Sequence, residues 1–188
     1  MLVVLELKRK AGKNEYVITK SPKTTKNYFT KSVNVLVILM KLFAELVPST
    51  VWYSSLYRLL PSEVWNTLRD DIISKNGRRC QVCGETWGKM NLHERWSYDD
   101  KNFIQKLEGF ILLCTMCHHV KHIGLAGILA DHGKLDYNDV IAHFCKVNAC
   151  AMIDFTNHVD EAFATWNKRS QHQWRQEFGE YSIYLKKQ

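Results

Sequence analysis

The chain has 188 residues and carries 26 Lys and Arg against 19 Asp and Glu, a net charge of +7 at neutral pH. It is 46% hydrophobic and includes eight Phe, eight Tyr and six Trp, which excludes a disordered polymer and allows one compact domain with a small extension. The longest apolar run, from Val33 to Val47, is interrupted by polar residues and is too short to span a bilayer. The apolar start of the chain lacks the basic lead of a secretory signal, so we expect a cytoplasmic protein.

Basic residues are concentrated near the N-terminus. Residues 1–31 contain eight Lys and Arg and two acids, a net charge of +6, whereas the other 157 residues hold 18 bases and 17 acids. A basic arm on a nearly neutral body attracts polyanions without reading their sequence, so Lys8, Arg9 and Lys10 are candidate contacts to nucleic acid. The alternative is a lysine-rich surface that only keeps the protein soluble.

Residues 1–50 are expected to form an extension made of a hairpin and a helix. Apolar runs on both sides of the turn-forming segment Lys10-Ala11-Gly12-Lys13-Asn14 predict the hairpin. Ser32 is a candidate N-cap for a helix from Val33 to Val47, which Pro48 ends. Most of the surface of this helix would be apolar, so we expect it to pack against its own domain or against a second copy in a homodimer.

Residues 51–188 are expected to form the main domain. A helix is predicted from Ser62 to the residue before Gly77, because these residue types are typical of helix starts and ends. A second, short helix is predicted from Lys101 to Lys106, with the preceding Tyr98-Asp99-Asp100 as its cap.

The C-terminal part of the chain predicts two further helices and a strand. Asp136 can cap a helix that continues to Val147. Apolar residues spaced by threes and fours predict another helix from Val159 to Trp174, which Gly179 would end. The residues from Tyr181 to Leu185 favour a closing strand, so the sequence indicates a mixed α+β fold.

Four of the six cysteines form two pairs, Cys80-x2-Cys83 and Cys114-x2-Cys117. A two-residue gap lets both thiolates of one turn face the same ion, and two such turns supply the four sulfur ligands that Zn²⁺ prefers. Because all four positions would be filled by protein, the sequence predicts a structural zinc. Two disulfides or four unrelated buried thiols are the alternatives, and the lack of a secretory signal disfavours them.

Histidines lie between and directly after the cysteine pairs. His93 stands in the segment Leu92-His93-Glu94, and His118 and His122 follow the last cysteine at a spacing of four. On a helix this spacing puts two imidazoles on one face, where both can reach the same ion. The second cysteine pair would fix the start of that helix and so direct both side chains.

These motifs together resemble a known family. A Cys-x2-Cys pair, a strand histidine and Leu-Cys-x2-Cys-His-x2-Lys-His are similar to the HNH, or ββα-metal, endonucleases over about a quarter of the chain, residues 79–124. The resemblance implies a ββα-metal core with zinc knuckles and flanking helices. It also implies hydrolysis of phosphodiester bonds in DNA, with Mg²⁺, Mn²⁺ or another divalent cation, to give 5′-phosphate and 3′-hydroxyl ends.

The resemblance assigns roles to matching residues. His93 falls where the family has its general base, and His118 and His122 fall where it has metal ligands on the helix. A neutral imidazole can take a proton from the attacking water, while a divalent cation stabilises charge on the phosphate and the departing 3′-oxygen. Lys121 and Arg95 are candidate contacts to the phosphates of the nucleic acid.

Two positions depart from the family pattern. Leu92 stands where members often have a further metal ligand, and an acid, Glu94, follows His93 instead. Either Glu94 is a ligand in the catalytic site, or His93 is itself a ligand and the base lies elsewhere. Gly109 occupies the usual place of the middle Asn, so another Asn would have to substitute for it.

Three hypotheses follow for the function. The leading one is a metal-dependent endonuclease. The alternative is a catalytically weak or inactive module of the same fold that binds nucleic acid or protein. A third is an inhibitor or regulatory subunit that uses the helix from Val33 to Val47 as its interface.

Overall fold

A computed structural model of the chain describes residues 5–9, 16–20 and 40–185. Its contacts divide the chain into two units, Met1–Ile38 and Leu39–Gln188. In the first unit, strands β1 (Leu5–Arg9) and β2 (Tyr16–Lys20) pair antiparallel, which confirms the predicted hairpin. The part of the predicted N-terminal helix before residue 40 lies outside the described residues.

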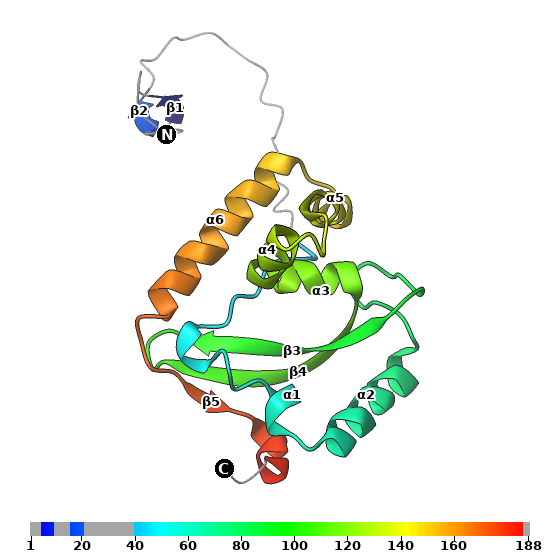
Figure 1. Cartoon of the computed structure of the whole chain (residues 1–188). Coiled ribbons are helices and arrows are strands. Elements are labelled where there is room, and N and C mark those ends of the chain that lie inside the picture. The colour runs from blue at the N-terminus through cyan, green and yellow to red at the C-terminus, as the bar shows by residue number, and fades with distance from the viewer. Residues whose placement is uncertain (1–4, 10–15, 21–39, 186–188) are drawn as a thin grey trace, which may run out of the picture. The chain divides into compact units, whose positions relative to one another are not determined.

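The second unit is built on a long hairpin of two strands, β3 (Met90–Asp99) and β4 (Ile104–Cys114), which pair antiparallel (Figure 1). His93 lies opposite Ile111, and the register shifts at a bulge between Arg95 and Trp96. A short strand, β5 (Arg175–Glu177), pairs in parallel with the start of β4 and completes a three-stranded sheet.

The turn of this hairpin replaces the helix that the sequence predicted from Lys101 to Lys106. One carboxylate oxygen of Asp99 accepts hydrogen bonds from the backbone N–H groups of Lys101 and Asn102, both at 3.0 Å. Phe103 then takes a left-handed backbone conformation, with φ of 53°, and β4 begins at the next residue. The prediction was wrong because an aspartate that can cap a helix can equally close a tight turn.

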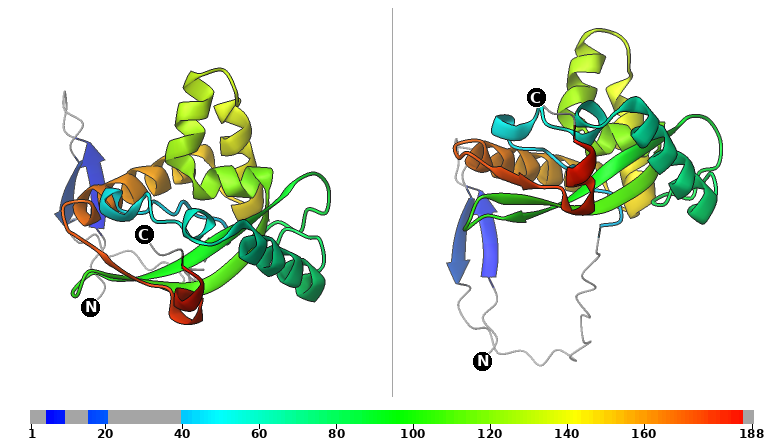
Figure 2. Two further views of the ribbon diagram at one scale, coloured as in Figure 1. Left: turned by 60° about the horizontal axis from the view of Figure 1, so that its bottom comes forward. Right: turned by 90° about the horizontal axis from the view of Figure 1, so that it is seen from below.

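Helices flank the hairpin on both sides. α3 to α6 gather on one side of it, and α1 and α2 lie on the other (Figures 1 and 2). The elements are η1 (Ser49–Val51), α1 (Leu56–Leu59), α2 (Ser62–Asn76), α3 (Thr115–Lys121), α4 (Ile123–Asp131), α5 (Tyr137–Asn148), α6 (Met152–Arg169) and η2 (Gly179–Tyr184). The protein is therefore a mixed α+β fold with a small sheet. Within the described ranges, no helix has the length and apolar character needed to span a bilayer.

Two of the predicted helices are confirmed. α2 has Gly77 as its C-cap residue, as the sequence indicated, but Ser62 is its first helical residue and not its cap, because Pro61 is the N-cap residue. α5 begins after Asp136, whose side chain accepts a hydrogen bond from the backbone N–H of Asn138 at 2.8 Å. Capping by a short acidic side chain satisfies one of the free N–H groups of the first turn.

The C-terminal predictions need correction. α6 ends at Arg169 and not at Trp174, whose indole N–H donates a hydrogen bond of 2.8 Å to the carbonyl of Arg169. This contact turns the chain back toward the sheet, where β5 forms. The strand predicted from Tyr181 to Leu185 is instead the 3₁₀ helix η2.

Residues 40–48 form an irregular segment where the sequence predicted the second half of a helix. The backbone N–H of Leu42 donates to the side chain of Asn148 at 3.0 Å, and that of Glu45 donates to the carbonyl of Lys121 at 2.9 Å. Because these donors are bound by α3 and α5, they cannot bond to carbonyls of their own segment as a helix requires. The 40–48 segment thus belongs to the second unit, although the sequence placed it in the extension.

The main core lies between the hairpin and α3 to α6. Leu112 and Leu113 of β4, Phe144 of α5 and Leu42 of the 40–48 segment are all fully buried there. Three cysteines of the predicted zinc site, Cys80, Cys114 and Cys117, belong to the same buried cluster.

Asn148 holds the 40–48 segment against α5. Its side-chain oxygen accepts from the N–H groups of Lys41 and Leu42, and its amide donates to the carbonyl of Leu42 at 2.8 Å. We expect Asn148→Ala to lower the free energy of unfolding by about 3 kcal/mol, because it leaves buried backbone groups without partners. The matched control, Asn76→Ala at the exposed end of α2, should change it by less than about 0.5 kcal/mol. Urea unfolding measures both, and equal effects would contradict the assigned role.

Candidate metal centres

The four paired cysteines converge on one point. Their sulfur atoms all lie within 4.8 Å of one another, and those of Cys83 and Cys114 are 3.6 Å apart. Gln81 fixes the first pair beside the second, because its backbone N–H donates to the carbonyl of Leu112 and its side chain accepts from the Leu112 N–H at 2.7 Å. No cysteine of the chain is in a disulfide, so all four sulfurs are available to one ion.

The surroundings of these sulfurs favour a bound cation. Hydrogen bonds from Cys114 and Cys117 lower the pKa of the Cys80 thiol well below its ordinary value, whereas the pKa values of Cys114 and Cys117 are raised because their sulfurs lie beside the same ionised group. The Nε2 atom of His143, on α5, lies 3.1 Å from the sulfur of Cys117. A neutral imidazole can donate its N–H to a thiolate, and such contacts commonly hold the ligands of a metal site. Four thiolates at this spacing suit Zn²⁺.

The second cluster consists of the three histidines of the family-like motif. The ligand nitrogens of His93, His118 and His122 all lie within 4.8 Å of one another. His93 comes from β3, His118 from α3, and His122 ends α3 as its C-cap residue. Since Cys114 and Cys117 stand at the start of α3, the cysteine cluster anchors the helix that carries two of these histidines.

Burial keeps two of the three histidines, His118 and His122, neutral. Desolvation lowers the pKa of His118 to about 3 and that of His122 to about 4, and the neighbouring histidines add to the effect. His93 is also buried, with 6% of its surface exposed. Neutral imidazoles carry the lone pairs that a cation binds, so the cluster is prepared to accept one near neutral pH.

A carboxylate that the sequence did not single out completes this site. Glu45 accepts a hydrogen bond from Nε2 of His93 at 2.9 Å and another from the ammonium group of Lys121 at 3.0 Å. Burial raises the pKa of Glu45, but the bond from His93 and the charge of Lys121 outweigh it, so the net shift is downward and the group is ionised. Because an ionised carboxylate only accepts, Nε2 of His93 carries a proton, and Nδ1 is left to bind an ion or a proton.

Other residues singled out from the sequence lie outside the cluster. Glu94 accepts a hydrogen bond of 2.6 Å from the backbone N–H of Leu56, and burial raises the pKa of its carboxyl group. The ammonium group of Lys121 is buried between Glu45 and the ring of Phe43, 3.3 Å from the ring centre.

The remaining candidate contacts to nucleic acid are spread over both units. Arg95 is exposed on β3, and its guanidinium donates to the carbonyl of Glu108 at 3.4 Å. Lys8 and Arg9 stand in β1 of the first unit, and Lys10 lies outside the described residues.

Comparison with known proteins adds no family assignment. No protein-family model matches the chain, and neither a curated protein nor a solved structure matches it.

Removing one sulfur tests the cysteine centre. We expect the native protein to hold about one zinc per chain, and Cys80→Ser to lose it and to unfold at least about 3 kcal/mol more easily, because zinc binding contributes directly to folding. Cys145→Ser is the matched control, since Cys145 lies outside the cluster. Elemental analysis and chemical unfolding give both values. Zinc retained by Cys80→Ser would contradict the assignment.

The histidine cluster predicts an unusual titration. Without added cation, the rings of His118 and His122 should stay neutral from pH 7 down to pH 5, because their pKa values are lowered to about 3 and about 4. Unfolded histidines bind protons below about pH 6.5, so stability should fall as the pH drops from there. Nitrogen NMR of the two rings measures the midpoints. A midpoint near 6.5 for either ring would show that the cluster is not packed as described.

Proposed function

We propose that this protein is a metal-dependent endonuclease of the HNH, or ββα-metal, type that hydrolyses phosphodiester bonds in DNA. The observation that carries the proposal is the convergence of His93, His118 and His122 beside a four-cysteine centre. His93 lies on the first strand of the hairpin and the other two follow on the helix, the strand–strand–helix order of the ββα-metal name. A purely structural protein has no need for three imidazoles whose ligand nitrogens converge on one point, two of them with lowered pKa values.

His118 and His122 would hold the divalent cation. Imidazole nitrogens bind Mn²⁺, Ni²⁺ and Zn²⁺ readily, and Mg²⁺ binds through the remaining water and phosphate oxygens. When bound, the ion stabilises negative charge on the phosphate and on the departing 3′-oxygen. Because both rings are uncharged at neutral pH, cation binding there does not first require loss of a proton.

His93 is proposed as the general base, with Glu45 as its positioning residue. The carboxylate fixes the proton of the ring on Nε2, which leaves the Nδ1 lone pair to take a proton from water. The water oxygen then forms a bond to phosphorus, and the bond from phosphorus to the 3′-oxygen breaks. The departing 3′-oxygen takes a proton from solvent, so the products are a 5′-phosphate and a 3′-hydroxyl, and the carboxylate stabilises the charged imidazolium that has formed.

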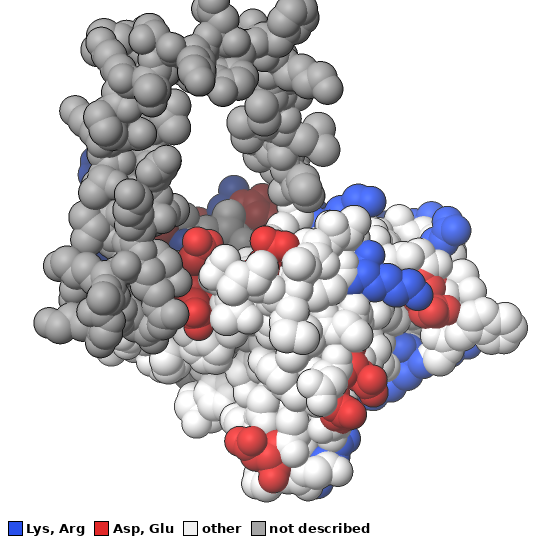
Figure 3. Space-filling view, turned by 90° about the horizontal axis from the view of Figure 1, so that it is seen from above, with Lys and Arg blue, Asp and Glu red and all other residues white. Residues whose placement is uncertain are grey.

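Phosphate contacts are proposed for exposed basic groups. Arg95 is exposed and two residues from His93 on the same strand, whereas Lys121 is buried and is better described as a partner of Glu45. Where Figure 3 shows the second unit uncovered, Lys and Arg side chains lie on the surface with acidic side chains among them. Residues 1–31, with eight bases and two acids, would add affinity that does not depend on sequence.

A non-catalytic binding module of the same fold is the second candidate. The observation that favours it is the residue before His93, since Leu92 is apolar and buried and cannot be a metal ligand. Glu94, the other acid near the base, is already bound to the backbone of Leu56. Both candidates require the zinc centre, so only an activity measurement separates them.

A plasmid-nicking assay tests the proposal. With Mg²⁺, Mn²⁺ or Ni²⁺ added, the native protein should convert supercoiled DNA to the open circle, and His93→Ala or His118→Ala should each reduce the rate at least about 100-fold. His132→Ala is the matched control, because His132 follows α4 and is exposed outside the cluster.

The nicking rate of His132→Ala should equal that of the native protein. With excess chelator, the native protein should not nick DNA. Native protein that binds plasmid and single strands but leaves both intact with every cation would favour the non-catalytic module.

A further inference from the structure

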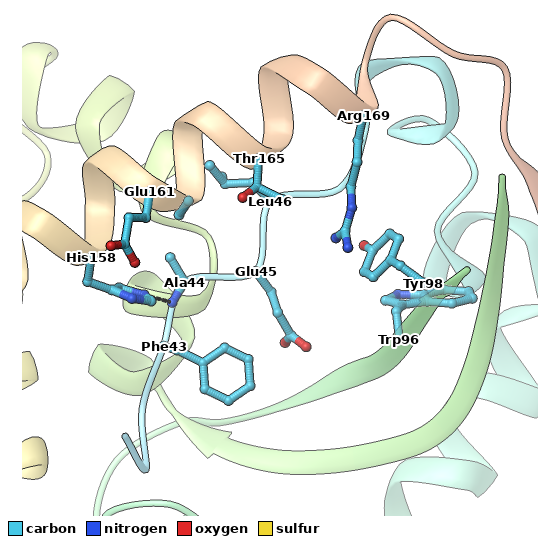
Figure 4. Close-up of a pocket in the computed structure, with 11 residues that line it drawn as sticks. Phe43, Ala44, Glu45, Leu46, Trp96, Tyr98, His158, Glu161, Thr165 and Arg169 are labelled. Atoms are coloured by element: carbon cyan, nitrogen blue, oxygen red, sulfur yellow. Dashed lines mark hydrogen bonds between the residues drawn. The ribbon is translucent and has the colours of Figure 1, made fainter. Parts of the chain in front are cut away.

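A pocket of about 310 Å³ lies between α6, β3 and the 40–48 segment (Figure 4). Glu45 forms part of its wall, and the same carboxylate accepts the hydrogen bond from His93. The pocket is therefore next to the histidine cluster, one side chain away from the proposed base. A group that enters it would lie beside Glu45, the carboxylate that bonds to His93.

Aromatic rings form one side of this pocket. Trp96 and Tyr98, both from β3, are half-buried in its lining. Each ring makes a T-shaped contact with another ring: Trp96 with Phe178, at 5.9 Å between ring centres, and Tyr98 with Trp174, at 5.5 Å. Trp96, fixed in this way, offers flat apolar surface without a large loss of side-chain entropy on binding, whereas one face of the Tyr98 ring is covered by the guanidinium group of Arg169.

Arg169 also lines the pocket, and a neighbouring carboxylate neutralises its positive charge. Its guanidinium group points into the pocket in Figure 4, 4.0 Å from the centre of the Tyr98 ring. Two hydrogen bonds, of 2.7 and 2.8 Å, tie it to the carboxylate of Asp100. The wall also carries the carboxylates of Glu45 and Glu161. Lys121 pairs with Glu45 as Arg169 pairs with Asp100, so these cations leave little attraction for a phosphate and the wall favours an uncharged group that donates hydrogen bonds.

We propose that this pocket holds one unpaired nucleobase of the strand bound at the histidine cluster. A base is flat, uncharged and rich in N–H donors, and it stacks on aromatic rings and on guanidinium planes. The pocket volume is at the lower end for small-molecule sites and is large enough for a single base. A base in an intact duplex is stacked and paired, so the occupant is one that is already single-stranded or has turned out of the helix.

This inference rests on the proposed function, because it takes a nucleic acid strand as the substrate. It extends that function by naming what the enzyme recognises beside the cut: an unpaired nucleotide and not a duplex sequence. The carboxylates of the wall accept hydrogen bonds, so a base with an exocyclic amino group, such as cytosine or adenine, fits better than thymine.

Filling the pocket tests the inference. Ala162 lines it and Ala164, two residues further along α6, is exposed outside it, so Ala162→Phe and Ala164→Phe form a matched pair. The probe is a fluorescently labelled single-stranded oligonucleotide with alternating adenine and cytosine, titrated with the full-length protein without added divalent cation. We expect Ala162→Phe to weaken binding about tenfold, because one stacked base is lost, and Ala164→Phe to bind within about twofold of the native protein.

A blunt duplex of the same sequence, and an oligonucleotide that carries only sugar and phosphate, distinguish the base from the backbone. Binding of both should be unaffected by Ala162→Phe. Equal weakening of duplex and single strand, or no weakening of either, would overturn the inference. If Ala162→Phe does not fold, Thr165→Trp blocks the same pocket from an exposed position and carries the same expectations.

These outcomes distinguish failure of the pocket inference from failure of the nuclease proposal. Binding is read without cutting, so base-dependent binding by a protein that never nicks DNA would support the pocket and reject the enzyme. Nicking that persists while Ala162→Phe binds single strands like the native protein would support the enzyme and reject the pocket.

Discussion

The packing of four cysteine sulfurs around one point is the constraint on which the rest of the second unit depends. It joins the turn that carries Cys80 and Cys83 to the end of β4 and the start of α3. Because α3 begins at this centre, its position relative to the hairpin is fixed there, and so are the directions of His118 and His122. The helix has only seven residues and could not hold such an orientation by its own hydrogen bonds.

A second link comes from outside the hairpin. The 40–48 segment brings the Glu45 carboxylate to His93 and to Lys121, and the backbone N–H of Glu45 donates to the carbonyl of Lys121. Three elements that are distant in the sequence therefore meet at one buried carboxylate. The burial that stabilises this arrangement also excludes water from the imidazoles, which lowers the pKa values of His118 and His122.

The correct predictions of site residues came mostly from the spacing of residues that are close together in the sequence. The two Cys-x2-Cys pairs and the His118–His122 interval are set by turn and helix geometry, so the sequence alone predicted both clusters. Glu45 could not be found in this way, because its partners lie 48 and 76 residues away and no motif joins them. His143 is hidden for the same reason, since its contact with Cys117 depends on how α5 packs.

The helices that the sequence predicted and the structure lacks have identifiable causes. Apolar spacing predicted a helix through residues 40–47, but the tertiary hydrogen bonds to Asn148 and Lys121 compete with that helix. Asp99 closes a hairpin turn with the same oxygen that could have capped a helix. Bonds to distant residues thus decide the structure of the 40–48 segment, whereas bonds to the next two or three residues decide the turn at Asp99.

The central claim is that two different ions bind two separate centres, four sulfurs for a structural ion and the histidines for a catalytic one. The most direct test is a crystal structure of the zinc-containing protein soaked in Mn²⁺, with anomalous diffraction recorded at the edges of both metals. We predict a zinc peak among the four sulfurs and a manganese peak beside His118 and His122, which is absent in His118→Ala. Manganese bound elsewhere on the chain, or no manganese peak at all, would contradict the claim.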